Sequence, residues 1–270
     1  MSDRRIRPAV IVGVDGSEAA IHAAEWAADE AFSRDVSLLM LAIIKATHSS
    51  AEDYHRDVAH AEKSLRAAQN AIEAMRTPVK VETEILRGRP GAILVSESDD
   101  AEMICVGSVG IGRYSRALLG STATEVAEKA HCPVAVIRSR PDQSGPNINW
   151  IVVAVGDSPE RDTVVDQAMR EAQLRKLPVL AIATVQADAA DAPSHELENR
   201  LWPWRRWYPD VRIYPVTTGV NVTRFLKTVD DLVPMAVVGA ADAGDLAQIV
   251  GPHDRSVFPH AQSSVLIVRE

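Results

Sequence analysis

The chain repeats itself once, and this repetition constrains its fold more than any other feature of the sequence. The matching segments are 10–17 (VIVGVDGS) with 151–158 (IVVAVGDS), and 134–138 (VAVIR) with 265–269 (VLIVR). Each half is long enough to bury a core of its own. The repetition therefore predicts two domains of one kind, residues 1–143 and 147–270, with a boundary near residue 145 in a polar segment that contains proline and glycine.

Each half alternates short apolar runs with segments of helical period, which predicts an α/β fold with a parallel sheet covered on both faces. In the first half we expect strands at 9–14, 36–44, 79–86, 103–106 and 134–138. The helices are expected at 17–32, 51–75, 91–98 and 122–130. Such sheets bind ligands outside the carboxyl ends of their strands, so the loops after the first and fourth strands should share one ligand.

A glycine-rich loop follows the fourth expected strand. Residues 107–113 read GSVGIGR, and residues 120–122 read GST, which gives the pattern G-x2-G-x9-G-S. Glycine lets the main chain approach an anion closely, and the N-terminus of the following helix favours phosphate. The loop contains no lysine, so it is not a P-loop, and its late position excludes a Rossmann fingerprint. The pattern predicts a phosphate-binding loop of another kind.

The charge and composition narrow the choice of partners. The net charge of −8 argues against nonspecific binding to nucleic acid, which depends on basic patches. The sequence offers no secretory signal and no apolar run long enough for a bilayer, so we expect a cytoplasmic protein with no membrane contact. The only two cysteines, Cys105 and Cys132, are interpreted as reduced, structural thiols.

Three motifs together resemble the universal stress protein family in its tandem two-domain form. They are the opening GVDGS at 13–17, the G-x2-G-x9-G-S pattern, and HCPV at 131–134 before the last strand of the first half. The resemblance implies two doubly wound, five-stranded parallel sheets of strand order 3-2-1-4-5. It also implies that the domains pair through their last strands about a pseudo-twofold axis, as an internal pseudo-dimer, and it leaves a homodimer open. Members that carry the motif bind ATP, with or without Mg²⁺.

Carried over by position, the resemblance assigns an ATP site to the first half. Asp15 is expected near the ribose or a metal-bridged phosphate, and the backbone of Ile43 at the adenine. The expected binding residues are Gly13, Asp15, Ile43, Gly107, Ser108, Val109, Gly110, Ile111, Gly112, Arg113, Gly120, Ser121 and Thr122. We expect no catalytic residue and no resident metal site, and we interpret the His and Asp residues of segment 48–60 as a loop and a solvated helix face.

The second half departs from the motif. Its acid moves by one position to Asp157, two carboxylates enter the later loop at Asp242 and Asp245, and Pro252-His253 replace the two hydroxyl residues. We therefore expect weak or absent ATP binding there and a structural or partner-binding role. The aromatic stretch 202–209 (WPWRRWYP) is interpreted as a helix end packed on the sheet, with a partner surface as the alternative.

The sequence thus predicts an ATP-binding regulatory protein of the stress response, which couples nucleotide occupancy to conformation or to an unidentified protein partner, rather than an enzyme. Two alternatives stay open. One is a slow ATPase or nucleotidyl-transfer enzyme, which would need a positioned base and a metal clamp. The other is an interaction module with a vestigial site.

Overall fold

The computed structural model divides the chain into two compact units, residues 1–139 and 140–270. It describes residues 8–110, 119–138, 149–156, 158–184, 192–220, 222–226, 233–241 and 263–269. The predicted linker lies outside these residues, so the domain boundary near residue 145 stays a prediction. Each unit is described by itself below.

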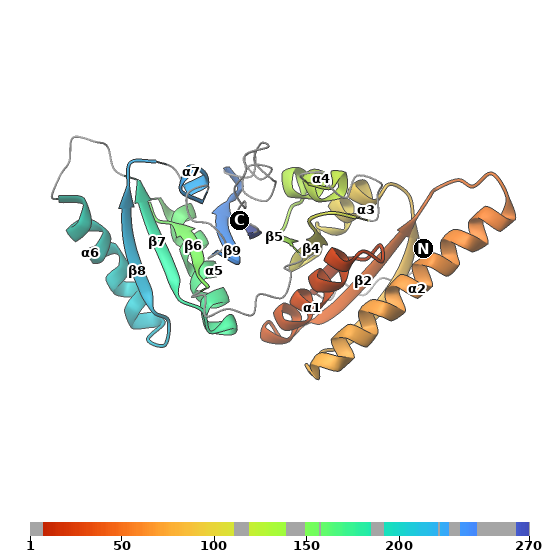
Figure 1. Cartoon of the computed structure of the whole chain (residues 1–270), viewed down its shortest axis with the longest axis horizontal. Coiled ribbons are helices and arrows are strands. Elements are labelled where there is room, and N and C mark those ends of the chain that lie inside the picture. Colours follow the sequence, from red (N-terminus) through yellow and green to blue (C-terminus); the bar gives the residue numbers. More distant parts are fainter. Residues whose placement is uncertain are drawn as a thin grey trace, which may run out of the picture. The chain divides into compact units, whose positions relative to one another are not determined.

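The first unit is a parallel five-stranded sheet with helices between its strands (Figure 1). Its elements are β1 (Ala9–Gly13), α1 (Glu18–Ser33), β2 (Ser37–Ile44), α2 (Ala51–Met75), β3 (Val81–Arg87), α3 (Pro90–Glu97), β4 (Met103–Gly107), α4 (Ser121–Lys129) and β5 (Val134–Ile137). The strands are ordered β3-β2-β1-β4-β5, which confirms the predicted order 3-2-1-4-5. β1 therefore lies beside β4, and their following loops open on the same edge.

The second unit repeats this arrangement. Its elements are β6 (Ile151–Ala154), α5 (Pro159–Arg175), β7 (Val179–Thr184), α6 (Ala192–Trp207), β8 (Ile213–Thr218), α7 (Val222–Leu226), β9 (Met235–Gly239) and β10 (Ser264–Val268). Its second and third helices, α6 and α7, are shorter than α2 and α3 of the first unit. Its strands are ordered β8-β7-β6-β9-β10, the same 3-2-1-4-5 topology. The fold class is confirmed in both units, and the pseudo-twofold relation between them stays a prediction.

The central strands are buried along their length because helices cover both faces of each sheet. β4 and β9 have the same pattern, four buried residues followed by a half-buried glycine. α1 packs closely because its buried face is mostly alanine, at positions 19, 20, 23, 24, 27, 28 and 31. A Cβ atom on Gly107 would lie 2.7 Å from the carbonyl carbon of Ala19. The absent side chain of Gly107 therefore lets α1 rest against the end of β4.

The observed boundaries of the first unit differ from the predicted ones by at most two residues. α2 has the predicted bounds, because Ser50 caps its N-terminus by accepting from the N–H of Asp53. β3 begins two residues later than predicted, since the N–H of Val79 bonds the carbonyl of Thr77 in a turn. Both cysteines are buried thiols, as the sequence predicts.

The aromatic stretch of α6 only partly follows the prediction of a packed helix end. Trp204 is buried, but Trp202 and Trp207 are 62% and 65% exposed. Trp207 packs edge-on against Trp204 at 5.2 Å between ring centroids, while most of its own surface stays exposed. The hydroxyl of Tyr208 donates to Asp166 at 2.7 Å, and burial raises the pKa of Tyr208.

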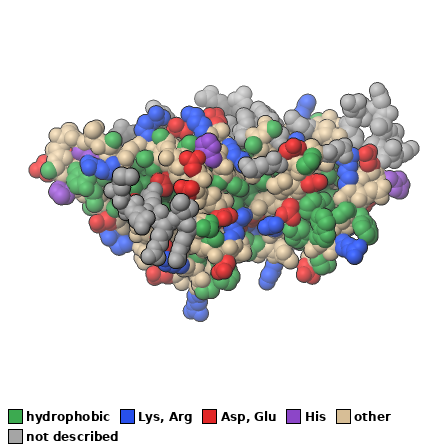
Figure 2. Space-filling view, turned by 180° about the vertical axis from the view of Figure 1, so that it is seen from behind, with side chains coloured by type: hydrophobic (Ala, Val, Ile, Leu, Met, Phe, Trp, Pro, Cys, Tyr) green, Lys and Arg blue, Asp and Glu red, His purple; other side chains and the backbone are tan. Residues whose placement is uncertain are grey.

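The described residues on the face drawn in Figure 2 form no large patch of one charge. On the face in Figure 2, acidic and basic side chains are interspersed. Within the described ranges, no helix is both long enough and apolar enough to cross a membrane. The basic stripe that marks nonspecific nucleic-acid binding is not seen on that face.

Candidate functional site

A cavity of about 370 Å³ opens at the carboxyl edge of the first sheet. Its walls come from the ends of β1, β2 and β4, the starts of α1, α3 and α4, and the connecting loops. The predicted binding residues that line it are Gly13, Asp15, Ile43, Gly107, Val109, Gly110, Gly120, Ser121 and Thr122. The topology therefore joins segments that lie more than 100 positions apart in the sequence, as Asp15 and Ser121 do.

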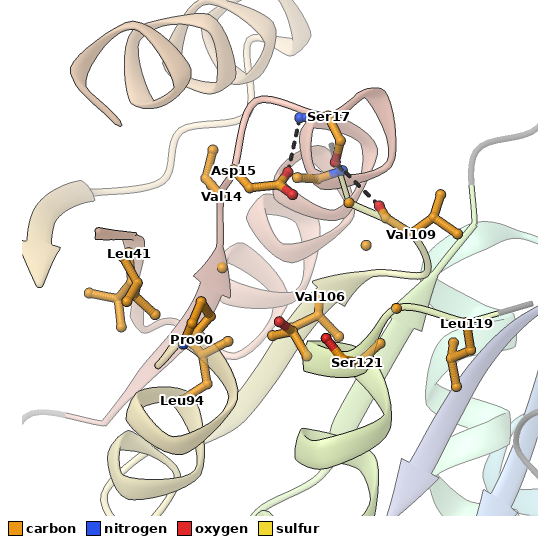
Figure 3. Close-up of a pocket in the computed structure, with 18 residues that line it drawn as sticks. Val14, Asp15, Ser17, Leu41, Pro90, Leu94, Val106, Val109, Leu119 and Ser121 are labelled. Atoms are coloured by element: carbon orange, nitrogen blue, oxygen red, sulfur yellow. Dashed lines mark hydrogen bonds between the residues drawn. The ribbon is translucent and has the colours of Figure 1, made fainter. Parts of the chain in front are cut away.

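Asp15 faces the glycine loop across the cavity mouth (Figure 3). Its Oδ1 accepts the N–H of Ser17 at 2.9 Å, which holds the carboxylate at the start of α1. A Cβ atom on Gly110 would lie 2.5 Å from Oδ2 of Asp15. Position 110 must therefore remain glycine if Asp15 is to keep this place.

Ser17 links the two loops as well as capping α1. Its Oγ accepts the N–H of Ala20 at 3.2 Å, and its hydroxyl donates to the carbonyl of Val109 at 3.3 Å (Figure 3). The sequence predicts only the cap. The second bond crosses 92 positions and depends on β1 and β4 being neighbours.

The N-terminus of α4 opens on the cavity. Gly120 is its N-cap residue, and no described side chain caps this end. The N–H of Gly120 bonds the carbonyl of Ser108 at 2.8 Å, which fixes the loop against the helix start. The first N–H groups of a helix have no partner within the helix, so an anion can accept them. Ser121 and Thr122 add two hydroxyl donors at the same place.

Ser108 differs from its predicted role. Only 2% of it is exposed, and it does not line the cavity. Its N–H donates to Ile137 at 2.7 Å and its carbonyl accepts from Gly120, so both backbone groups serve the fold. Ile111, Gly112 and Arg113 lie outside the described residues, and their predicted roles stay predictions.

Ile43 presents backbone groups to the cavity. The carbonyl of Leu41 accepts the N–H of Val14 at 2.8 Å, and this is the last bond between the two segments in the described structure. Alternate residues of a strand direct their N–H and C=O to the same side of the strand. The backbone groups of Ile43 therefore point toward β1, as those of Leu41 do, but at a level beyond the end of β1. A donor and an acceptor of one residue are therefore left open at the cavity wall.

The rest of the wall is apolar apart from Ser17, and the sequence did not predict it. It consists of Val14, Ser17, Ala20, Leu41, Pro90, Leu94, Val106, Leu119 and Ala123. Most of these residues lie at or next to the end of a strand or the start of a helix at the carboxyl edge, a position that the predicted topology already indicates. Asp15 is the only ionisable side chain among the described residues of the wall.

The corresponding edge of the second unit has different side chains. Ser158 caps α5 by accepting from the N–H of Arg161 at 3.4 Å, as Ser17 caps α1. The third residue after the cap is Arg161 here and Ala20 in the first unit. A Cβ atom on Gly156 would lie 3.1 Å from Cγ of Arg161, so the arginine stem covers the loop. Asp157, Asp242, Asp245 and Pro252-His253 lie outside the described residues.

The fold and the cavity define a doubly wound α/β protein with a ligand-sized cavity at its topological switch point. The family model described as "Universal stress protein family" matches residues 8–138. Universal stress protein Rv2624c of Mycobacterium tuberculosis (strain ATCC 25618 / H37Rv) is 55% identical over 260 residues, which cover 96% of each chain. Universal stress protein Rv2028c of the same strain is 36% identical over 270 residues, covering 97% of this chain and 96% of the relative.

A solved structure has the same fold over both units. The crystal structure of a universal stress protein from Archaeoglobus fulgidus DSM 4304 matches with a TM-score of 0.70 and 16% identity, covering 97% of this chain and 96% of that one. With these matches, the chain belongs to the universal stress protein family, as the three motifs had indicated.

Proposed function

We propose that the first unit binds ATP and that the protein is a nucleotide-responsive regulator of the stress response. The observation that carries this proposal is the N-terminus of α4, which no described side chain caps. It opens, with the Ser121 and Thr122 hydroxyls, on a cavity that Asp15 and Gly110 also line. The cavity volume of about 370 Å³ lies within the usual range for small-ligand sites. Family membership supports the stress-related part of the proposal.

The two ends of the cavity suit the two ends of the nucleotide. The apolar wall of Leu41, Leu94 and Pro90 suits a base, and the start of α4 suits phosphates. At the base end, the N–H and C=O of Ile43 can meet the N1 acceptor and the N6 donor of adenine. Guanine presents a donor at N1 and an acceptor at C6, so the same groups would select against it.

We infer a binding role rather than catalysis from the same residues. A phosphoryl-transfer enzyme needs a group that orients or activates the nucleophile, together with charge neutralisation on the phosphates. Asp15 is the one described ionisable side chain in the wall, and it is held by the N–H of Ser17. This carboxylate could bind a Mg²⁺ ion that the triphosphate carries, or it could accept a hydrogen bond from a ribose hydroxyl.

Calorimetric titration of the purified chain with ATP, GTP and adenosine, each with and without Mg²⁺, tests the proposal. We expect saturable ATP binding. GTP should bind at least about tenfold more weakly, because the donor and acceptor on the edge of guanine are reversed relative to adenine. Adenosine should also bind more weakly than ATP, because it has no phosphate to accept from the N-terminus of α4. Equal affinities for ATP and adenosine would contradict the phosphate assignment. No binding by any of the three would leave the interaction module as the better account.

A further inference from the structure

α2 contacts the loop that carries Asp15, although α2 does not line the cavity. Nε2 of His60 lies 3.1 Å from the backbone carbonyl oxygen of Asp15. One turn further along α2, the hydroxyl of Ser64 donates to the carbonyl of His60 at 2.9 Å. The outer side of the β1–α1 loop thus rests on one turn of α2.

The chemistry fixes the direction of the His60 bond. A carbonyl oxygen only accepts, so Nε2 of His60 must carry the proton and donate. Ser64 cannot take over this task, because its hydroxyl already donates to His60. Of the two α2 residues, His60 is therefore the one that donates to the Asp15 carbonyl.

The backbone between Asp15 and Ser17 depends on hydrogen bonds from neighbouring segments for its orientation. Gly16 has a φ of +87°, a region open to glycine with little steric penalty. A Cβ atom on Gly16 would lie 2.6 Å from Oγ of Ser64, so the loop also lies directly against α2. Because glycine leaves the peptide free to rotate, the orientation of Asp15 depends on what binds its two ends.

We propose that His60 is a positioning residue of the nucleotide site, one that sets the orientation of Asp15 from outside the cavity. Ser17 holds the carboxylate of Asp15 through its N–H, and His60 holds the carbonyl. With both bonds in place, the carboxylate lies under Gly110 at the cavity mouth. The ligand in this inference rests on the proposed function, whereas the positioning of the loop does not.

The inference is tested with three variants of the full chain. His60→Leu removes the donor and replaces the imidazole with an apolar side chain of moderate size. His60→Gln keeps an N–H donor of similar reach. His55→Leu makes the same change on α2 at a residue whose described contact is a tilted ring pair with Tyr54, at 5.5 Å between centroids.

Two readouts separate positioning from binding. The first is amide hydrogen exchange of Ser17 in the nucleotide-free protein, because its N–H bonds the Asp15 carboxylate. We expect exchange at least about tenfold faster in His60→Leu, and within about twofold of wild type in His60→Gln and His55→Leu. The second is the Kd for ATP, which should rise about 3- to 10-fold in His60→Leu alone, the size of effect that one hydrogen bond supports.

The outcomes are distinguishable. Unchanged Ser17 exchange in His60→Leu would overturn the positioning role, whatever the protein binds. Faster exchange with an unchanged Kd would overturn the link between Asp15 orientation and the nucleotide. Faster exchange in a protein that binds no nucleotide at all would keep the positioning of the loop and defeat the proposed function.

Discussion

The two units build the same sheet edge from the same backbone and fill it with different side chains. In both, a serine caps the helix after the first strand, and the fourth strand ends in a glycine after four buried residues. In the first unit Ala20 follows the cap and a cavity opens in front of it. In the second unit Arg161 occupies this sequence position, and its stem lies over Gly156.

The comparison separates what the fold requires from what the ligand requires. Apolar strands, helix caps and the order of the strands are shared, so they specify the α/β unit without any ligand. At this edge Asp15 and Ala20 are specific to the first unit, since the corresponding residues of the second unit are Gly156 and Arg161. A binding site can therefore be lost by a few side-chain changes while the fold persists.

The largest expected effect is in Gly110→Val. Its Cβ would lie 2.5 Å from Oδ2 of Asp15, so the side chain displaces the carboxylate and fills the cavity mouth. We expect the affinity for ATP to fall more than about 100-fold in calorimetry, with little loss of folding because the loop lies at the surface. Gly219→Val is the matched control, since a Cβ at Gly219 meets nothing within 4 Å. Normal ATP binding by a folded Gly110→Val variant would remove the basis for the site.

The next largest effect concerns the stability of the fold and tests a buried ion pair that both units share. Both carry a buried carboxylate paired with an arginine one turn later, Glu30 with Arg34 at 3.4 Å and Glu171 with Arg175 at 3.0 Å. Arg175→Met leaves the Glu171 carboxylate buried without its arginine, with the amide of Gln167 still donating to Oε1, so we expect the free energy of unfolding to fall by about 2–4 kcal/mol.

Urea unfolding measures this loss, and an exposed pair supplies the control. Arg66 and Glu62 have the same spacing, but their side chains are 63% and 51% exposed. Arg66→Met should cost less than about 0.5 kcal/mol. If Arg175→Met were as mild as this control, the repeated ion pair would not belong to the shared scaffold.

A third variant carries a residue of the second unit into the first. Ala20 lines the cavity and is 3% exposed, so Ala20→Arg should fill the space that the ligand needs. We expect ATP affinity to fall about tenfold or more. Glu18→Gln makes the same charge change of +1 in the same helical turn, at an exposed residue that does not line the cavity, and should alter affinity less. Equal effects of the two variants would point to charge at the helix start rather than to space.

The smallest effect comes from the two caps. Ser17→Ala and Ser158→Ala should each lower the free energy of unfolding by about 1 kcal/mol, because each cap serine accepts an N–H of its helix. Only Ser17 also donates to Val109, so only Ser17→Ala should weaken ATP binding, by a few fold. An equal loss of ATP affinity in both variants would show that the second unit contributes to the site.

The fold was largely predictable because helix caps, hydrophobic periodicity and the order of the elements all indicate the same structure. α2 is one example, since Ser50 marks its start and Leu65, Ala68 and Ile72 recur at helical spacing on its buried face. The glycine loop was predictable for a similar reason, because glycine, strand and helix follow one another in the chain. These features are local, and one sequence is enough to see them.

The missed features depend on contacts between distant segments. His60 lies 45 positions from Asp15, and its helix looks solvated from sequence alone. The second bond of Ser17 needs β1 beside β4, and the burial of Ser108 needs β5. Trp202 and Trp207 are exposed because helix packing buries only one side of α6, which the count of aromatic residues does not reveal.

The central claim, one working site in a duplicated chain, is tested most directly by counting nucleotide. The purified protein is saturated with ATP and Mg²⁺, freed of excess ligand, denatured, and the released nucleotide is identified and measured per chain, with Gly110→Val in parallel. The account predicts about one ATP per chain for the wild-type protein and none for the variant. Two per chain would contradict the silent second unit, and none for the wild type would contradict the site itself.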